Sequence, residues 1–365
     1  MDQKLLDKLT KRREGGTLRS LSHFEGFVDF FSNDYLGFAS ESISGIEKSS
    51  GGTGSRLISG TTQEVLLAER NLAEFFSTEA GLIFNSGYDA NLGFFSSVPQ
   101  RGDTVIYDEL IHASVRDGMR LSFANNQSFK HNDLIDLESK LEKTVGTVYV
   151  AVESLYSMDG DLAPLQKIGE LCEKYKAYLL VDEAHAAGIF GENGKGLVCA
   201  LGMEEKVLAR LVTFGKAYGS HGGCILGSKE LIDFLTNFAR SFIYTTALPA
   251  YVYARNAEVV KSQDLNERRG QLQHILNYFR SNFESDQLIS EVNSPIQIVQ
   301  IGDVEQTKII ATRLQNAGIA VKPIYSPTVP EGKERLRLCF HAFNTLSEVD
   351  ALVSELSNLS NSESQ

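Results

Sequence analysis

The sequence predicts an α/β protein whose large domain is built on a mostly parallel β-sheet with helices on both faces. Short apolar runs, such as residues 104–107 and 178–181, alternate with amphipathic stretches such as residues 133–143. Strands separated by helices of about 10–15 residues favour parallel pairing. The last hundred or so residues mix strands and helices differently. They predict a smaller α+β domain at the C-terminus.

The elements predict three parts: residues 1–40 as an N-terminal arm, 41–265 as the large domain and 266–365 as the C-terminal domain. The arm combines a helix within residues 1–20, which carries a basic patch, with a short strand at 27–31. In the large domain we expect strands at 81–84, 104–107, 146–152, 178–181, 209–214 and 223–227, and helices at 63–76, after 85–91, at 133–143 and from Pro164 onward.

A mostly helical region runs from about residue 248 past residue 280, and the boundary of the C-terminal domain is placed within it, at about residue 265. Thr345 and Glu348 form a capping-box pattern before an apolar stripe. Strands are expected at 296–301, 319–324 and 336–340, a helix at 305–317 and a polar tail at 358–365.

Composition excludes several classes of protein. The chain has 365 residues and a formal net charge of −12, which argues against a nucleic-acid-binding surface. No apolar run approaches the roughly 18 residues of a membrane helix. The N-terminus has no apolar signal core, so we expect a cytoplasmic protein. The four scattered cysteines predict neither a disulfide framework nor a zinc site, and no metal site is expected.

The most informative stretch surrounds Lys216. An apolar run at residues 209–214 predicts a buried strand, and Lys216 follows it after one glycine. The carboxyl ends of strands in open α/β sheets are where ligands bind. Desolvation there lowers the pKa of an amine and makes it a nucleophile toward carbonyl groups. From this stretch alone, a surface lysine on a turn is an equally good interpretation.

A second stretch, residues 181–185, reads Val-Asp-Glu-Ala-His and also ends a predicted strand. One interpretation is a P-loop ATPase or helicase, in which Asp182 would hold a metal on a nucleotide. That class needs a Walker A loop, which the glycine-rich residues 51–60 do not provide. In the other interpretation Asp182 pairs with a protonated ring nitrogen. An aspartate, a histidine and a lysine at strand ends fit an aldehyde cofactor with a pyridine ring.

The turn at residues 85–91 offers small and polar residues between a strand and a helix. Its backbone N–H groups could hold an anion such as a phosphate, although Asn85 or Ser86 could equally be an ordinary N-cap. His112 is a candidate to stack on the ring of a cofactor, and the alternative is a structural histidine.

Together these segments resemble the α-oxoamine synthases, which use pyridoxal phosphate to condense an amino acid with an acyl thioester and release CO₂. The resemblance covers nearly the whole chain. The segments most specific to the family read Ser-Met-Asp-Gly-Asp at 157–161, Val-Asp-Glu-Ala-His at 181–185, Thr-Phe-Gly-Lys at 213–216 and Pro-Thr-Val-Pro at 327–330. The resemblance implies the fold-type I, aspartate aminotransferase-like architecture and a homodimer with shared active sites.

The resemblance also implies a role for individual residues. Lys216 would form the Schiff base and act as general base, Asp182 would pair with the ring nitrogen, and His185 would bond the ring hydroxyl. His112 would stack on the ring. Arg337 would bind the amino-acid carboxylate, Asn33 would contact the substrate, and Arg19 would meet the far end of the acyl chain. The other expected cofactor contacts are Ser157, Thr213, Gly87 and Tyr88, with Thr245 or Thr246 from a second subunit. Arg56, in the glycine-rich loop, could touch the pantetheine or phosphate of the thioester.

Within the family, segments such as His-Asn-Asp at 131–133 are most similar to members that condense L-alanine with pimeloyl-CoA or pimeloyl-acyl-carrier protein. A sister enzyme that uses serine or glycine is the alternative. A binding or scaffold protein without a cofactor, in which the lysine is idle, is the remaining hypothesis.

Overall fold

The computed structural model describes residues 2–19, 21, 23–41 and 51–357 of the chain. These residues form two units. The larger unit comprises residues 33–157 and 161–273, and the smaller one residues 1–32, 158–160 and 274–365. The three-part domain division stays a prediction, and the expected tail at 358–365 lies outside the described residues.

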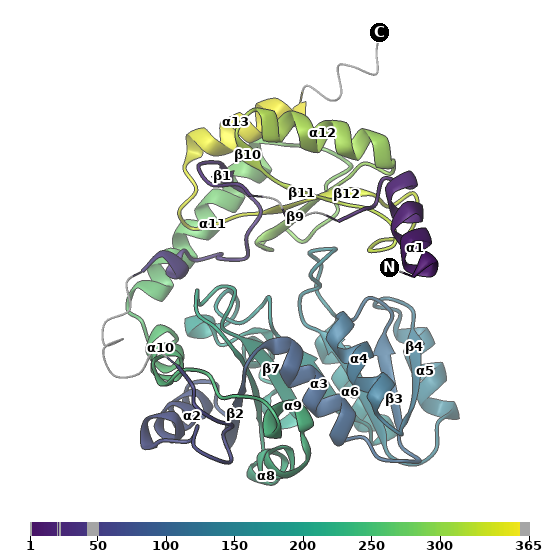
Figure 1. Cartoon of the computed structure of the whole chain (residues 1–365), viewed down its shortest axis with the longest axis vertical. Helices are drawn as coiled ribbons and strands as arrows, with labels where there is room; N and C mark the ends of the chain where they lie inside the picture. Colours follow the sequence, from purple (N-terminus) through teal and green to yellow (C-terminus); the bar gives the residue numbers. More distant parts are fainter. Residues whose placement is uncertain (1, 20, 22, 42–50, 358–365) are drawn as a thin grey trace. The chain divides into compact units, whose positions relative to one another are not determined.

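The larger unit is built on a seven-stranded sheet with the order β2-β8-β7-β6-β5-β3-β4 (Figure 1). Only β8 runs against its neighbours, so the prediction of a mostly parallel sheet is confirmed. The strands are β2 (Ala80–Phe84), β3 (Thr104–Asp108), β4 (Asn125–Phe129), β5 (Val148–Glu153), β6 (Tyr178–Asp182), β7 (Ala209–Thr213) and β8 (Gly223–Gly227).

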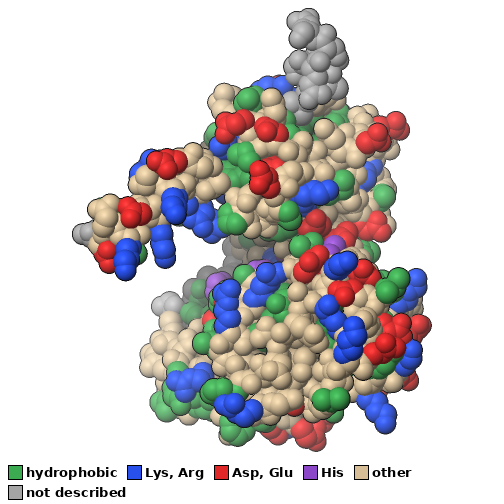
Figure 2. Space-filling model, turned by 90° about the vertical axis from the view of Figure 1, so that its right-hand side faces the viewer, with side chains coloured by type: hydrophobic (Ala, Val, Ile, Leu, Met, Phe, Trp, Pro, Cys, Tyr) green, Lys and Arg blue, Asp and Glu red, His purple; other side chains and the backbone are tan. Residues whose placement is uncertain are grey.

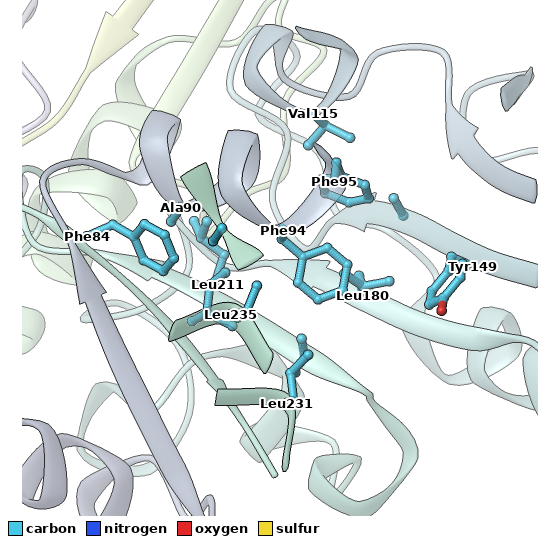
Figure 3. Close-up of a cluster of buried hydrophobic side chains, with 14 of the residues drawn as sticks. Phe84, Ala90, Phe94, Phe95, Val115, Tyr149, Leu180, Leu211, Leu231 and Leu235 are labelled. Atoms are coloured by element: carbon cyan, nitrogen blue, oxygen red, sulfur yellow. The ribbon is translucent and has the colours of Figure 1, made fainter. Parts of the chain in front are cut away.

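Helices cover both faces of this sheet because side chains alternate along each strand. Ala151 of β5 faces a cluster that includes Phe94, Phe95 and Leu235 (Figure 3). Its neighbour Val150 faces a second cluster. The first cluster draws on α3 (Gly87–Ser97), α4 (Ala113–Leu121) and α8 (Lys229–Phe238), and the second on α5 (Leu134–Lys143) and α6 (Leu165–Tyr175).

The remaining helices of the larger unit are shorter or lie outside these two clusters. They are α2 (Gln63–Phe75), α7 (Leu197–Ala200), α9 (Arg240–Ile243) and α10 (Ala250–Val259). The long helix α11 (Asp264–Asn282) follows, as the helical region expected from residue 248 onward predicts.

The smaller unit contains a three-stranded antiparallel sheet with the order β11-β12-β9. The expected capping box is present, since Glu348 N donates to Thr345 Oγ1 at 3.3 Å and Thr345 N donates to Glu348 Oε2 at 2.7 Å. The elements are α1 (Gln3–Glu14), β1 (Val28–Asp29), β9 (Ile296–Gln300), α12 (Val304–Asn316), β10 (Ile319–Ala320), β11 (Lys322–Ile324), β12 (Arg335–Cys339) and α13 (Leu346–Ser357).

Two expectations about elements are wrong. The single strand expected at 319–324 is two strands, because β10 pairs with β1 whereas β11 pairs with β12 in another sheet. The sequence analysis also missed α4 and β4. β4 reads Asn-Asn-Gln-Ser-Phe and is mostly exposed, so it lacks the apolar run that marks a strand.

Across the described residues, no helix combines the length and apolar character needed to cross a lipid bilayer. All four cysteines are free thiols, as the scattered spacing predicts. Figure 2 shows acidic and basic side chains intermixed on the face in view. No broad basic surface for nucleic acid is visible on that face.

His131 holds two carboxylates in the larger unit. Its Nδ1 lies 2.9 Å from Asp108 Oδ1 at the end of β3, and its Nε2 lies 2.8 Å from Asp161 Oδ2. Burial by itself would lower the pKa of His131, but the bonds to the two carboxylates outweigh it and raise the pKa to about 10. The imidazolium therefore fixes residue 161, where the chain re-enters the larger unit.

The stability of the protein should fall at high pH through His131. Because its pKa is higher in the folded state, the stabilisation is complete below about pH 6.5 and is lost as the pH rises through about 10. Denaturant unfolding of the parent and of His131→Gln should therefore differ most at about pH 6 and least above pH 10. The exposed His274→Gln serves as the control. A difference between parent and His131→Gln that does not change with pH would contradict the ion pairs.

Candidate active site

Lys216 lies just beyond the end of a buried strand, as the sequence predicts. Four of the five residues of β7 are buried, and the strand ends at Thr213, three residues before the lysine. The Lys216 side chain is half-buried, and its Nζ lies 2.7 Å from Nε2 of His185. An amine placed at the carboxyl end of a parallel strand is positioned to meet a ligand at that edge of the sheet.

Asp182 ends β6, the strand next to β7. The backbone N–H of Ala184 donates to Oδ1 at 3.0 Å, and Asn91 Nδ2 donates to Oδ2 at 2.8 Å. Two neutral donors therefore fix the carboxylate without neutralising its charge. A carboxylate held in this way can keep the nitrogen of a bound pyridine ring protonated.

His185 connects Lys216 to residues 33–35. Its Nδ1 lies 2.7 Å from the hydroxyl of Tyr35, and that hydroxyl donates to Asn33 Oδ1 at 3.1 Å. Successive hydrogen bonds within the larger unit therefore link Asn33, Tyr35, His185 and Lys216.

His112 caps the N-terminus of α4 and keeps an exposed surface. Its Nδ1 lies 2.7 Å from the hydroxyl of Ser114, which also accepts from Asn91 Nδ2 at 3.0 Å. Burial lowers the pKa of His112. The charge of Asp182 raises this pKa, and the charge of Lys216 lowers it further. A neutral imidazole with an open surface suits stacking against an aromatic ring.

The turn before α3 forms a close-packed cradle. Ser86 is the N-cap of α3 and accepts from Asp89 N at 3.0 Å. A Cβ atom on Gly223 would lie 2.6 Å from Cα and N of Gly87, so β8 approaches the helix N-terminus only because Gly223 has no side chain. The first N–H groups of a helix have no partner within the helix and favour anions such as phosphate.

Three more of the expected cofactor contacts lie at this cradle. A Cβ atom on Gly87 would come within 3.5 Å of Thr213 Cβ. Asn85 Nδ2 donates to Thr245 Oγ1 at 3.0 Å and to the carbonyl of Thr246 at 2.9 Å. These threonines therefore contact the turn of their own chain, and a contribution from a second subunit stays a prediction. The hydroxyl of Tyr88 bonds Asp117.

The expected role of Arg56 is wrong. Its Nη1 and Nη2 donate to the two carboxylate oxygens of Glu69 at 2.8 and 2.9 Å, and its Nε donates to Thr61 at 3.0 Å. The guanidinium lies between the rings of Phe242 and Tyr253 and is only 6% exposed. An arginine with its donors occupied in this way serves the core and is not available to a thioester phosphate.

The two expected substrate arginines belong to the smaller unit. Arg337 lies on β12, is 6% exposed and donates to Cys339 Sγ at 2.9 Å. Arg19 lines a pocket of about 520 Å³ whose walls also include Leu18, Phe24 and Tyr325. This pocket combines an apolar wall with guanidinium groups.

The geometry of the larger unit fits pyridoxal phosphate. Lys216 could hold the aldehyde carbon, Asp182 the ring nitrogen and the N-terminus of α3 the phosphate. The cradle at Gly87, which a Cβ atom on Gly223 would fill, is the structural feature that favours a phosphate there. Among the described residues, no group of three or more His, Cys, Asp or Glu side chains is placed to hold a metal ion.

Sequence reasoning missed three residues that the structure brings to this site: Tyr35, Asn91 and Ser114. Asn91 and Ser114 are 4% and 0% exposed although both are polar. Such burial requires hydrogen-bond partners. The only signal in the sequence is a polar residue on the buried side of a helix, which does not reveal its partner.

Comparisons relate the chain to known proteins. The family model for aminotransferase class I and II matches residues 25–356. The chain is 39% identical to 8-amino-7-oxononanoate synthase of Emericella nidulans, over 89% of this chain and 87% of that protein. It is similar to a serine palmitoyltransferase from S. paucimobilis with a bound PLP–myriocin aldimine (28% identity, TM-score 0.88, 96% and 95% of the chains). It is also similar to 8-amino-7-oxononanoate synthase from Francisella tularensis, with 28% identity, a TM-score of 0.80 and coverage of 93% of this chain and 99% of that chain.

Because the cradle at α3 is closely packed, we expect one added methyl group to weaken binding of the cofactor. Gly223→Ala should push β8 and the N-terminus of α3 apart, and we expect cofactor affinity to fall by about tenfold or more. Titration of cofactor-free protein, followed by absorbance, measures this affinity. Gly270→Ala places the same methyl group in open space on α11 and should leave the affinity unchanged. Equal affinity of Gly223→Ala and the parent for the cofactor would contradict a role of the cradle in cofactor binding.

Proposed function

The chain belongs to the aminotransferase class I and II family, and on that premise we propose that it condenses L-alanine with a pimeloyl thioester. The products are 8-amino-7-oxononanoate, CO₂ and the free thiol carrier. The curated relative from E. nidulans carries that activity in its name. The carrier is coenzyme A or acyl-carrier protein, and the cofactor is pyridoxal phosphate.

One observation carries the proposal: Lys216, His185 and Asp182 meet at the ends of two paired strands, β6 and β7. Pyridoxal phosphate, when bound, supplies an electron sink for the negative charge that develops at the α-carbon of the amino acid. The chain's own groups then need to bind the ring, hold its nitrogen protonated and move one proton. Asp182 would keep the ring nitrogen protonated.

Lys216 Nζ would hold the aldehyde of the cofactor. As a free amine, the same atom would take the α-proton of the bound amino acid as a general base. His185 Nε2 lies 2.7 Å from Nζ and can share a proton with it. Tyr35, 2.7 Å from the other ring nitrogen, fixes the orientation of the imidazole.

The smaller unit supplies the features that suit the two substrates. Arg337 would bind the carboxylate of alanine, because a guanidinium can bond both oxygens. The pocket beside Arg19 would take the acyl chain, since its apolar wall suits methylene groups and its arginine suits the terminal carboxylate of pimelate.

We keep the prediction of a homodimer in the cytoplasm. The exposed apolar side chains of the larger unit include Leu57, Ile58, Leu66 and Leu67. A second copy of the chain could cover such side chains. The four free thiols agree with a reducing compartment.

A substrate panel tests the proposed function. Purified protein should show the visible absorption band of a bound pyridoxal group. It should release CO₂ with alanine and pimeloyl thioester in preference to glycine or serine with pimeloyl or palmitoyl thioester. Lys216→Ala is the matched control and should lose both the band and turnover. The sister function has a structural neighbour in serine palmitoyltransferase. Turnover only with serine or glycine would contradict the proposal that alanine is the substrate and would support the sister function.

The pocket beside Arg19 makes a separate prediction. Arg19→Ala should raise KM for the pimeloyl thioester by roughly tenfold to a hundredfold, because a charged hydrogen bond is lost. The heptanoyl thioester has the same chain length without the terminal carboxylate, so its KM should not change. Steady-state kinetics with both thioesters measures the difference. Equal effects on the two substrates would place the carboxylate elsewhere.

A further inference from the structure

Glu153 is a buried acid that none of the proposed roles uses. It is the last residue of β5, and its partner across the strands is Asp182 at the end of β6. The side chain is only 3% exposed, and Oε1 has no hydrogen-bond partner among the described residues. A buried polar atom without a partner in a well-packed sheet calls for an explanation.

Its nearest charged neighbours decide its ionisation. Asp182 and Glu153 end neighbouring strands in register, so both carboxyl groups cannot ionise cheaply. Asp182 is less buried and has donors on both oxygens. Burial raises the pKa of Glu153 well above its usual range, and the charge of Asp182 raises it further. Lys216 and backbone N–H groups act in the opposite direction.

Apart from Lys216, the groups that interact with Glu153 supply no counter-charge. The imidazole of His112 is neutral when its pKa is lowered, and the buried phenol of Tyr156 has a pKa raised well above its usual value. Lys216 interacts with Glu153 but already contacts His185. Burial, the neighbouring carboxylate and the unpartnered oxygen Oε1 therefore favour the neutral form of the Glu153 side chain.

The same carboxyl group contacts two turns of the site. The backbone N–H groups of His112 and Ser157 bond to it. His112 is the proposed stacking residue, and Ser157 is a proposed contact of the cofactor. A rigid side chain between these turns would set the separation of the groups that hold the ring.

We propose that Glu153 is a positioning residue that stays protonated at Oε1 and holds the His112 and Ser157 turns against the cofactor. This role rests on the proposed function. Its neutral state also matters, because a second anion beside Asp182 would compete for the proton that Asp182 has to keep on the ring nitrogen. Glutamine has the shape of a protonated glutamate, with a donor in place of the acidic O–H.

Glu153→Gln is therefore the decisive variant. We expect its affinity for pyridoxal phosphate to stay within about twofold of the parent, whereas Glu153→Ala should bind about tenfold more weakly. The pH midpoint of the visible band should be unchanged in Glu153→Gln. If Glu153 were ionised, removing its negative charge would lower that midpoint by about one unit or more.

A matched control comes from Glu69, which is also buried but is paired with Arg56. Glu69→Gln leaves a buried guanidinium without its partner and should lower the melting temperature of the cofactor-free protein by about 5 °C or more. Glu153→Gln, the same chemical change, should leave that melting temperature unchanged. This comparison needs neither cofactor nor substrate.

Two results would overturn the proposal. One is a Glu153→Gln protein whose cofactor-free form melts as early as Glu69→Gln, because an ionised carboxylate would then have been lost. The other is a Glu153→Ala protein that binds the cofactor as tightly as the parent. Failure of the proposed function would be distinguishable, because the parent itself would then lack the visible band or the expected turnover.

Discussion

Backbone hydrogen bonds hold β6 between β5 and β7, and this register decides where every polar side chain at that edge of the sheet lies. Glu153 faces Asp182 across one pair of strands, and Asp182 faces Leu211 across the other. A shift of one residue in any strand would turn its last side chain to the opposite face of the sheet. Burial of both faces in apolar clusters prevents such a shift.

From that edge, a hydrogen-bond network extends to α3 and α4. Asn91 of α3 contacts both Asp182 and Ser114, and Ser114 contacts His112. The carboxylate that would hold the ring nitrogen and the imidazole that would cover the ring are therefore positioned by one amide. Such coupled networks contribute more than the sum of their separate bonds.

The sequence predicted what local patterns encode. Apolar runs predicted β6 and β7 with Asp182 and Lys216 at or just beyond their ends, and the family resemblance implied the roles of these two residues. Contacts across long separations were not predictable, which is why Tyr35 and Asn91 were missed. Arg56 was assigned to a ligand because its buried partner Glu69, thirteen positions along the chain, looks like any surface acid in a helix. β4 and the division of residues 319–324 depend on pairing that composition does not specify.

The bond between Tyr35 and His185 joins residues 150 positions apart. A ribosome adds roughly 5–20 residues per second, so Tyr35 leaves the exit tunnel on the order of ten seconds before its partner. During that interval the tyrosine lacks its histidine partner. The hydrogen-bonded chain that ends at Lys216 can therefore form only after β6, β7 and the turns that follow them have left the ribosome.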